Sequence, residues 1–123
     1  MTLQHIVLFS FPRELSEGEA AQMRSMVASW PGKIGLMGKC RFGTDLTGAR
    51  TRGYSYLLYT EFPDAAALSS YRAHPVHVEF MDWLAERDCT PLAFDYYLGS
   101  DTVLMLEKNG ADALSQIPET DRR

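Results

Sequence analysis

The chain lacks a run of basic residues, a long apolar stretch and any cysteine spacing typical of a metal or redox motif. Its 123 residues carry a formal net charge of −4, and this acidic balance argues against a nucleic-acid-binding surface. No apolar segment approaches the roughly 20 residues needed to span a membrane, and the first residues lack the basic region of a secretory signal. We therefore expect a cytoplasmic protein without nucleic-acid or membrane partners.

Cysteine is also scarce. Cys40 and Cys89 are the only two, far apart and in neither a CxxC nor a zinc spacing. In a reducing compartment we expect no disulfide and interpret both as small buried side chains. With 46% hydrophobic and 23% charged residues, the chain has the composition and length of one globular domain.

Hydrophobic alternation predicts four strands, at residues 3–11, 36–45, 54–62 and 91–98. In the first of them Ile6 and Leu8 lie on one face, and the opposite face carries Leu3, His5, Val7, Phe9 and Phe11. Because both faces are apolar, this strand is expected to be covered on both sides.

Helix signals lie between these strands. Ser16 and Glu19 form a capping-box pattern, which is followed by an apolar stripe of Met23, Met26, Val27 and Trp30. Pro31-Gly32 is expected to end that helix. A second helix should open at Pro63-Asp64 and run to about Ala73. Pro75 disfavours helical backbone at His74 and suits the start of a third helix, which ends near Arg87.

The order β-α-β-β-α-(α)-β predicts an α+β domain with a four-stranded antiparallel sheet and helices on one face. The other face still carries large apolar side chains, so a monomer would expose an unusually large apolar patch. A second copy of the same sheet is the expected cover, which predicts a homodimer. We assign residues 1–98 to this domain and 99–123 to a C-terminal extension, with a short strand at 103–106 and then a frayed tail.

Two of the three histidines, His74 and His77, lie in the segment YRAHPVHVEF, residues 71–80. If Pro75 begins a helix, His77 lies in its first turn, where the helix dipole keeps the imidazole neutral and able to act as a general base. Tyr71 could then donate a hydrogen bond to a substrate carbonyl. The alternative is that His77 bonds a nearby carbonyl and has no chemical role.

His5 and His74 are candidate ligand-binding residues, and each also has a structural alternative. His74 occupies an N-cap position, although Ser, Asp and Asn are the preferred types there. His5 is either a core histidine or a pocket residue beside His77. His74 and His77 lie three residues apart, but the proline break and the lack of further ligands beyond Glu79 or Asp82 argue against zinc. We expect no metal and no cofactor.

Three segments, HIVLFSF, GYSYLLYTEFPDAAALSSY and YRAHPVHVEF, resemble the stress-responsive A/B-barrel family over residues 3–98. The resemblance implies a dimeric α+β barrel of ferredoxin-like topology. A plant polyketide cyclase related to the family closes a ring by aldol-type chemistry without a cofactor, and its catalytic Tyr and His fall on Tyr71 and His77. The family's first-strand histidine falls on His5, whereas Ser10 stands where members often have lysine.

The residues and the resemblance together lead to two main functional hypotheses. The first is a cofactor-free cyclase or isomerase that abstracts a proton from an apolar carbonyl substrate. The second is a non-catalytic homodimer that binds a small apolar ligand or protects partners under stress. A cofactor-free monooxygenase on the same fold is a further alternative, although no residue marks haem ligation. A cavity reached by both Tyr71 and His77 distinguishes an enzyme from a structural dimer.

Overall fold

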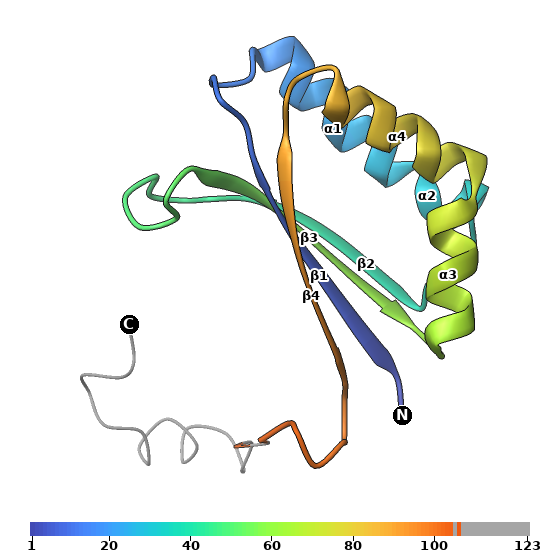
Figure 1. Ribbon diagram of the computed structural model, residues 1–123. Helices are drawn as coiled ribbons and strands as arrows, with labels where there is room; N and C mark the ends of the chain where they lie inside the picture. The colour runs from blue at the N-terminus through green and yellow to red at the C-terminus, as the bar shows by residue number, and fades with distance from the viewer. Residues whose placement is uncertain (105, 107–123) are drawn as a thin grey trace.

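The computed structural model describes residues 1–104 and 106. Figure 1 shows a single sheet with the helices gathered on one of its faces. The strands are β1 (Leu3–Ser10), β2 (Lys39–Thr44), β3 (Tyr54–Phe62) and β4 (Thr90–Tyr97). The helices are α1 (Glu17–Ala28), α2 (Trp30–Lys33), α3 (Ala65–Ala73) and α4 (Pro75–Ala85).

The sheet has the order β2-β3-β1-β4, and every neighbouring pair is antiparallel. At its centre Val7 of β1 pairs with Leu58 of β3 on one side and with Ala93 of β4 on the other. This arrangement confirms the predicted α+β domain with ferredoxin-like topology, a four-stranded antiparallel sheet and helices on one face.

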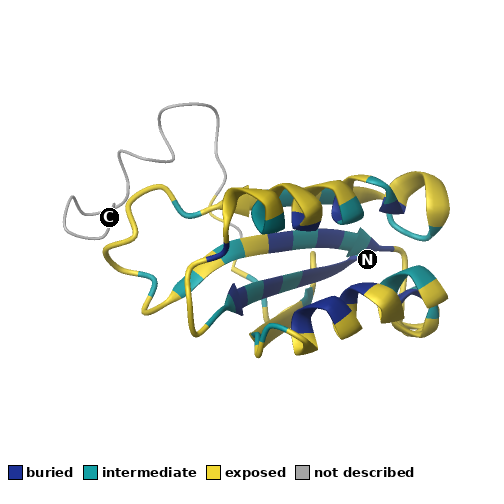
Figure 2. Cartoon of the chain, turned by 90° about the horizontal axis from the view of Figure 1, so that it is seen from above, coloured by how far each residue is buried: buried dark blue, intermediate teal, exposed yellow. Residues whose placement is uncertain are grey.

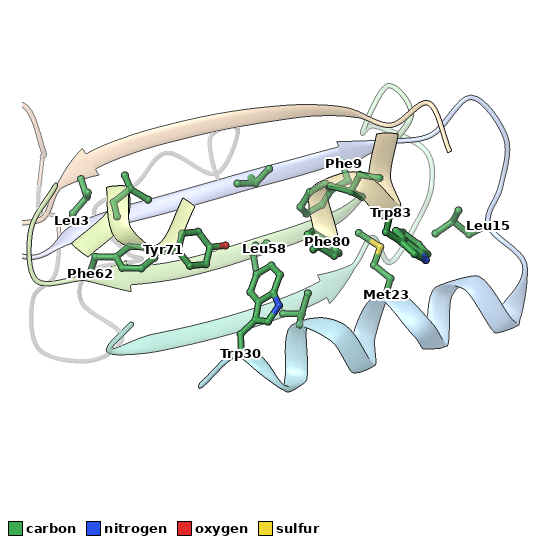
Figure 3. Packing of buried hydrophobic residues seen from close by; sticks show 14 residues of the cluster. Leu3, Phe9, Leu15, Met23, Trp30, Leu58, Phe62, Tyr71, Phe80 and Trp83 are labelled. Carbon is green, nitrogen blue, oxygen red and sulfur yellow. The ribbon is translucent and has the colours of Figure 1, made fainter. Parts of the chain in front are cut away.

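The core lies between the sheet and the helices. Buried residues face one another across this layer (Figure 2), and aromatic side chains occupy its length (Figure 3). As the alternation in the first strand predicts, Leu3, Val7 and Phe9 are buried beneath the helices. Since one sheet face takes every second residue, the same alternation places Ile6 and Leu8 on the opposite face.

The start of α1 follows the predicted capping box. Ser16 Oγ accepts a hydrogen bond from the Glu19 backbone N–H at 3.1 Å, and the Glu19 carboxylate accepts one from the Ser16 backbone N–H at 3.0 Å. The same carboxylate accepts a hydrogen bond of 2.8 Å from Arg87 Nε, which lies just after α4. A local capping residue therefore also ties two helices together.

Two predicted boundaries are wrong. Pro31-Gly32 does not end the helical region: α1 ends at Ala28, and both residues lie within the short helix α2. The reason is that Pro31 falls in the first turn of a new helix, where its missing N–H costs nothing. The second strand is shorter than residues 36–45, because the chain joins β3 only at Gly38, whose N–H donates to the Glu61 carbonyl at 2.7 Å.

The predicted break at His74-Pro75 is confirmed. α3 ends at Ala73, α4 begins at Pro75, and His74 between them has extended backbone with φ −63° and ψ 134°. His74 Nδ1 accepts a hydrogen bond from the Val76 N–H at 3.1 Å, so His74 is the N-cap of α4.

The helix-facing side of β4 is lined by smaller or polar side chains, whereas its large apolar ones point the other way. Pro91, Ala93 and Asp95 pair in register with the helix-facing residues of β1. Leu92 and Phe94 lie on the open face, by which we mean the side of the sheet without helices, and are 52% and 67% exposed. Pro91, Ala93 and Asp95 are themselves exposed, so the helices do not close over this edge strand.

The C-terminal extension predicted at 99–123, with a short strand at 103–106 and a frayed tail, stays a prediction. Val103 and Leu104 are described and belong to no strand, while Met105 and the tail after Leu106 lie outside the described residues. Within the described part of the chain, no helix combines the length and apolar character that crossing a membrane requires.

Candidate functional site

A cavity of about 390 Å³ lies between the sheet and the helices α3 and α4. Its walls are mostly apolar, with Val7, Leu58 and Phe80 among them. Four polar side chains also reach it, namely His5, Tyr71, Arg72 and His77. A mostly apolar cavity with a few converging polar groups is the usual form of a small-molecule site.

Tyr71, near the end of α3, is fully buried. Its ring lies 4.9 Å from that of Phe62 and 5.6 Å from that of Trp30, and Figure 3 shows it between these two residues. Burial raises the pKa of its hydroxyl well above the ordinary value, so the group stays protonated. That hydroxyl has no hydrogen-bond partner among the described protein atoms, and an unpaired buried hydroxyl costs about 1–3 kcal/mol.

His77 lies in the first turn of α4 with its ring centroid 4.4 Å from that of Tyr71. Its Nδ1 is 3.3 Å from the carbonyl oxygen of Arg72. Because a carbonyl can only accept, Nδ1 carries the proton, and a neutral ring then has its lone pair on Nε2.

Desolvation keeps that ring neutral. Burial lowers the pKa of His77, the bond to the Arg72 carbonyl acts in the opposite direction, and the nearby His5 and Arg72 side chains lower it further. The direction of this shift agrees with the neutral ring expected from the sequence, and burial is its largest cause.

His5 enters the cavity from the middle of β1. Its Nδ1 donates to the Asp95 carboxylate on the neighbouring strand. The other oxygen of Asp95 lies 3.8 Å from Nη2 of Arg72. His5 is therefore held by a carboxylate, with its ring 6.2 Å from that of Tyr71.

The structure brings three of the four predicted site residues together. His5, Tyr71 and His77 all line the cavity, although they come from β1, α3 and α4. His74 is not among the lining residues found in the described part of the chain, and its Nδ1 is occupied by the helix cap. A ligand-binding role for His74 stays a prediction without support from this geometry.

Sequence reasoning missed three neighbours of the site. Asp95 orients His5, Arg72 reaches the cavity, and Trp30 packs against the His77 ring at 5.7 Å. Asp95 could have been found, because it is the one charged residue in the alternating segment PLAFDYYL. The positions of Arg72 and Trp30 depend on how the helices pack, which no local pattern reports.

Metal binding finds no support in the arrangement of side chains. Among the described residues, no group of three or more His, Cys, Asp or Glu could hold a metal ion. The chemistry available in the cavity is that of two imidazoles, one phenol and one guanidinium.

Solved structures similar to this chain place it in a class of small α+β domains. A dimeric protein of ferredoxin-like fold from Bacteroides fragilis is 27% identical, with 77% of this chain and 94% of that chain covered and a TM-score of 0.66. An Arabidopsis thaliana protein is 26% identical over 82% of this chain and 99% of its own, with a TM-score of 0.68. A hydroxynitrile lyase from Passiflora edulis shares the fold with a TM-score of 0.67. It is 19% identical, with 80% of this chain and 96% of that chain covered.

The sequence itself identifies the family. The profile of the Stress Responsive A/B Barrel Domain matches residues 3–98, which is most of the chain and the whole of the sheet-and-helix unit. The chain therefore belongs to the stress-responsive A/B barrel domain family, as the three quoted segments predict. No functionally curated protein matches it.

Proposed function

We propose that this chain is a homodimer whose cavity performs cofactor-free proton transfer on a small carbonyl compound, as a cyclase or isomerase does. The observation that carries the proposal is the meeting of an unpartnered, buried Tyr71 hydroxyl and a neutral His77 in one cavity. One group can donate a hydrogen bond, and the other can accept a proton.

The chemical roles follow from the protonation states. Tyr71 would donate its O–H to the substrate carbonyl oxygen, where negative charge develops when an enolate forms. Nε2 of His77 would take the proton from the carbon next to that carbonyl and return it to the product. A neutral base in a mostly apolar cavity is suited to this step, because nothing has to be deprotonated beforehand.

The homodimer rests on the open face of the sheet. Leu92 and Phe94 are largely exposed there, and Leu57 of β3 is also exposed. The Bacteroides fragilis relative is described as dimeric. A second copy would remove this apolar surface from water, which is the usual basis of a stable homodimer interface.

The test measures proton abstraction without knowledge of the natural substrate. The full-length chain is incubated in D₂O with a panel of aryl alkyl ketones, such as propiophenone, and deuterium uptake next to the carbonyl is followed by NMR. We expect His77→Ala to slow the enzyme-dependent uptake by roughly 10²–10⁴-fold, the usual contribution of a general base. Tyr71→Phe should slow it less, because the ring and its packing remain.

Glu79→Gln is the matched control, since Glu79 is exposed on the same helix and should leave the uptake unchanged. Uptake no faster than in buffer, or full uptake by His77→Ala, would remove the catalytic proposal. Binding of the same ketones without uptake, detected through the fluorescence of Trp30 beside the cavity, would support the non-catalytic ligand-binding dimer instead.

A further inference from the structure

Arg72 is a cation on the wall of an otherwise mostly apolar cavity. It precedes the break between α3 and α4, its side chain is 54% exposed, and it lines the same space as Tyr71 and His77. Among the cavity's lining residues in the described part of the chain, it is the single lysine or arginine. The chain as a whole has a net charge of −4, so a positive group at this position does not belong to a generally basic surface.

The guanidinium of Arg72 is not saturated by its neighbours. Its contact with Asp95, 3.8 Å from Nη2 to Oδ2, is too long for a hydrogen bond. The other oxygen of Asp95 accepts from His5. Five N–H donors on a planar fork therefore lie beside the cavity with one loose ion pair to offset the charge.

Arg87 shows what a structural arginine looks like in the same molecule. Its Nε donates to Glu19 at 2.8 Å, its Nη1 donates to the Trp83 carbonyl at 3.0 Å, and its guanidinium stacks on the Trp83 ring at 4.0 Å. Among the described residues, the Arg72 side chain has only the 3.8 Å contact with Asp95. The difference suggests that the donors of Arg72 serve a group that enters from outside.

The cavity then has three chemically distinct parts. Apolar side chains such as Val7, Leu58 and Phe80 form most of its wall. Tyr71 and His77 offer a donor and a proton acceptor. Arg72 offers a fork whose geometry matches a carboxylate, which it can bind through two parallel hydrogen bonds.

We propose that the compound bound in this cavity is a small apolar keto acid, and that Arg72 binds its carboxylate. The acid group lies at the exposed side of the cavity with the guanidinium, and the apolar body lies against the inner wall. Asp95 keeps its bond to His5, while the carboxylate of the ligand takes the donors that Asp95 leaves free. This inference rests on the proposed function to the extent that both need the same cavity to take a carbonyl compound.

The test compares two probes of nearly the same shape, of which one ends in a charged carboxylate and the other in a neutral amide. They are 4-oxo-4-phenylbutanoate and its neutral amide, 4-oxo-4-phenylbutanamide, and binding to the full-length protein is measured by calorimetry. We expect the acid to bind at least about tenfold more tightly than the amide, as a charge-assisted pair contributes. Arg72→Gln should remove that preference, Arg72→Lys should keep part of it, and Arg24→Gln, a change of an exposed arginine on α1, should leave it intact.

Three outcomes would overturn the inference, and they differ in what else they affect. Equal binding of acid and amide by the wild type refutes the carboxylate site but leaves the ketone chemistry standing. Equal weakening of both probes by Arg72→Gln shows that Arg72 only positions Asp95. Binding of neither probe refutes the inference, and deuterium uptake by propiophenone then decides separately whether the proposed function survives.

Discussion

The two faces of the sheet come from the same four strands, yet they differ in how far their apolar side chains are shielded from water. Beneath the helices, the side chains of Phe9, Leu58 and Phe62 are at most 2% exposed. On the open face, Leu92 and Phe94 of β4 remain 52% and 67% exposed. The helices cover the first face over β1 and β3, whereas no helix among the described residues covers the second.

Each face departs from the simple rule that apolar groups lie inside and polar groups outside. The covered face buries His5 and the hydroxyls of Thr60 and Tyr71, which costs free energy unless each group finds a partner. The open face leaves large apolar groups in water. His5 is paired with Asp95 and Thr60 with the His5 carbonyl, whereas the Tyr71 hydroxyl has no partner among the described residues. A ligand hydrogen-bonded to Tyr71 and a second copy on the open face would remove the remaining costs.

The largest effect on this comparison is expected from Phe80→Ala on the covered face. The Phe80 ring packs edge-to-face on Trp30 at 5.0 Å and on Phe9 at 5.9 Å, and it is almost completely buried. Removing it should lower the free energy of unfolding by about 3–5 kcal/mol, measured by urea unfolding. Val78→Ala, on the exposed side of the same helix, should change it by less than about 0.5 kcal/mol. Similar losses in the two variants would show that the cavity side is not the core.

Substitutions on the open face should change the association of two chains and not the folding of each chain. Wild-type protein is expected to sediment at about twice the chain mass of 13.9 kDa. Phe94→Asp should raise the dimer dissociation constant by at least about 100-fold, or about 2.7 kcal/mol, while the monomer stays folded. Val78→Asp places the same charge on the helix side and should leave the dimer intact. A wild-type monomer, or equal weakening by both variants, would contradict the assignment of the open face.

The smallest expected effect concerns pH and His77. Burial lowers its pKa in the folded chain below the ordinary 6.5, so between these two values the unfolded chain binds more protons than the folded one. The free energy of unfolding should therefore fall as the pH decreases through 6.5 toward the folded value. His77→Gln removes this contribution, while His5 and His74 remain in both proteins.

Urea unfolding of the wild type and His77→Gln between pH 8 and 5 measures the effect. The stability of the wild type relative to the variant should decline toward acid pH. A constant difference, or one that grows toward acid pH, would mean that His77 is not held neutral by burial.

Much of the fold could be predicted because its signals are local. Alternation in β1 separates Val7 from Leu8, and the Ser16 and Glu19 capping box begins α1 at the predicted residue. Pro75 breaks the helix because proline restricts the residue before it, whatever lies around it. The same reasoning failed at Pro31, since whether a proline ends one helix or begins another depends on the turn in which it falls.

The residues of the candidate site also fall into those that a local pattern relates and those that only strand pairing brings together. Tyr71 and His77 are six positions apart on either side of one helix break, so a sequence pattern could relate them. His5 and Asp95 are ninety positions apart, and only the pairing of β1 with β4 brings them together. A motif can report neighbours along the chain, but it cannot report the register of a distant strand.

The sequence by itself determined the element order, the helix break and the two residues at the centre of the proposal, because capping, alternation and proline geometry act over a few residues. Tertiary structure alone decided that there is a cavity. Pro91 and Ala93 on the helix-facing side of β4 are small and remain exposed, so the cavity between sheet and helices stays open along this edge strand. The same packing buries His77 and brings Arg72 to the cavity wall, since burial and cavity volume depend on every element that meets there.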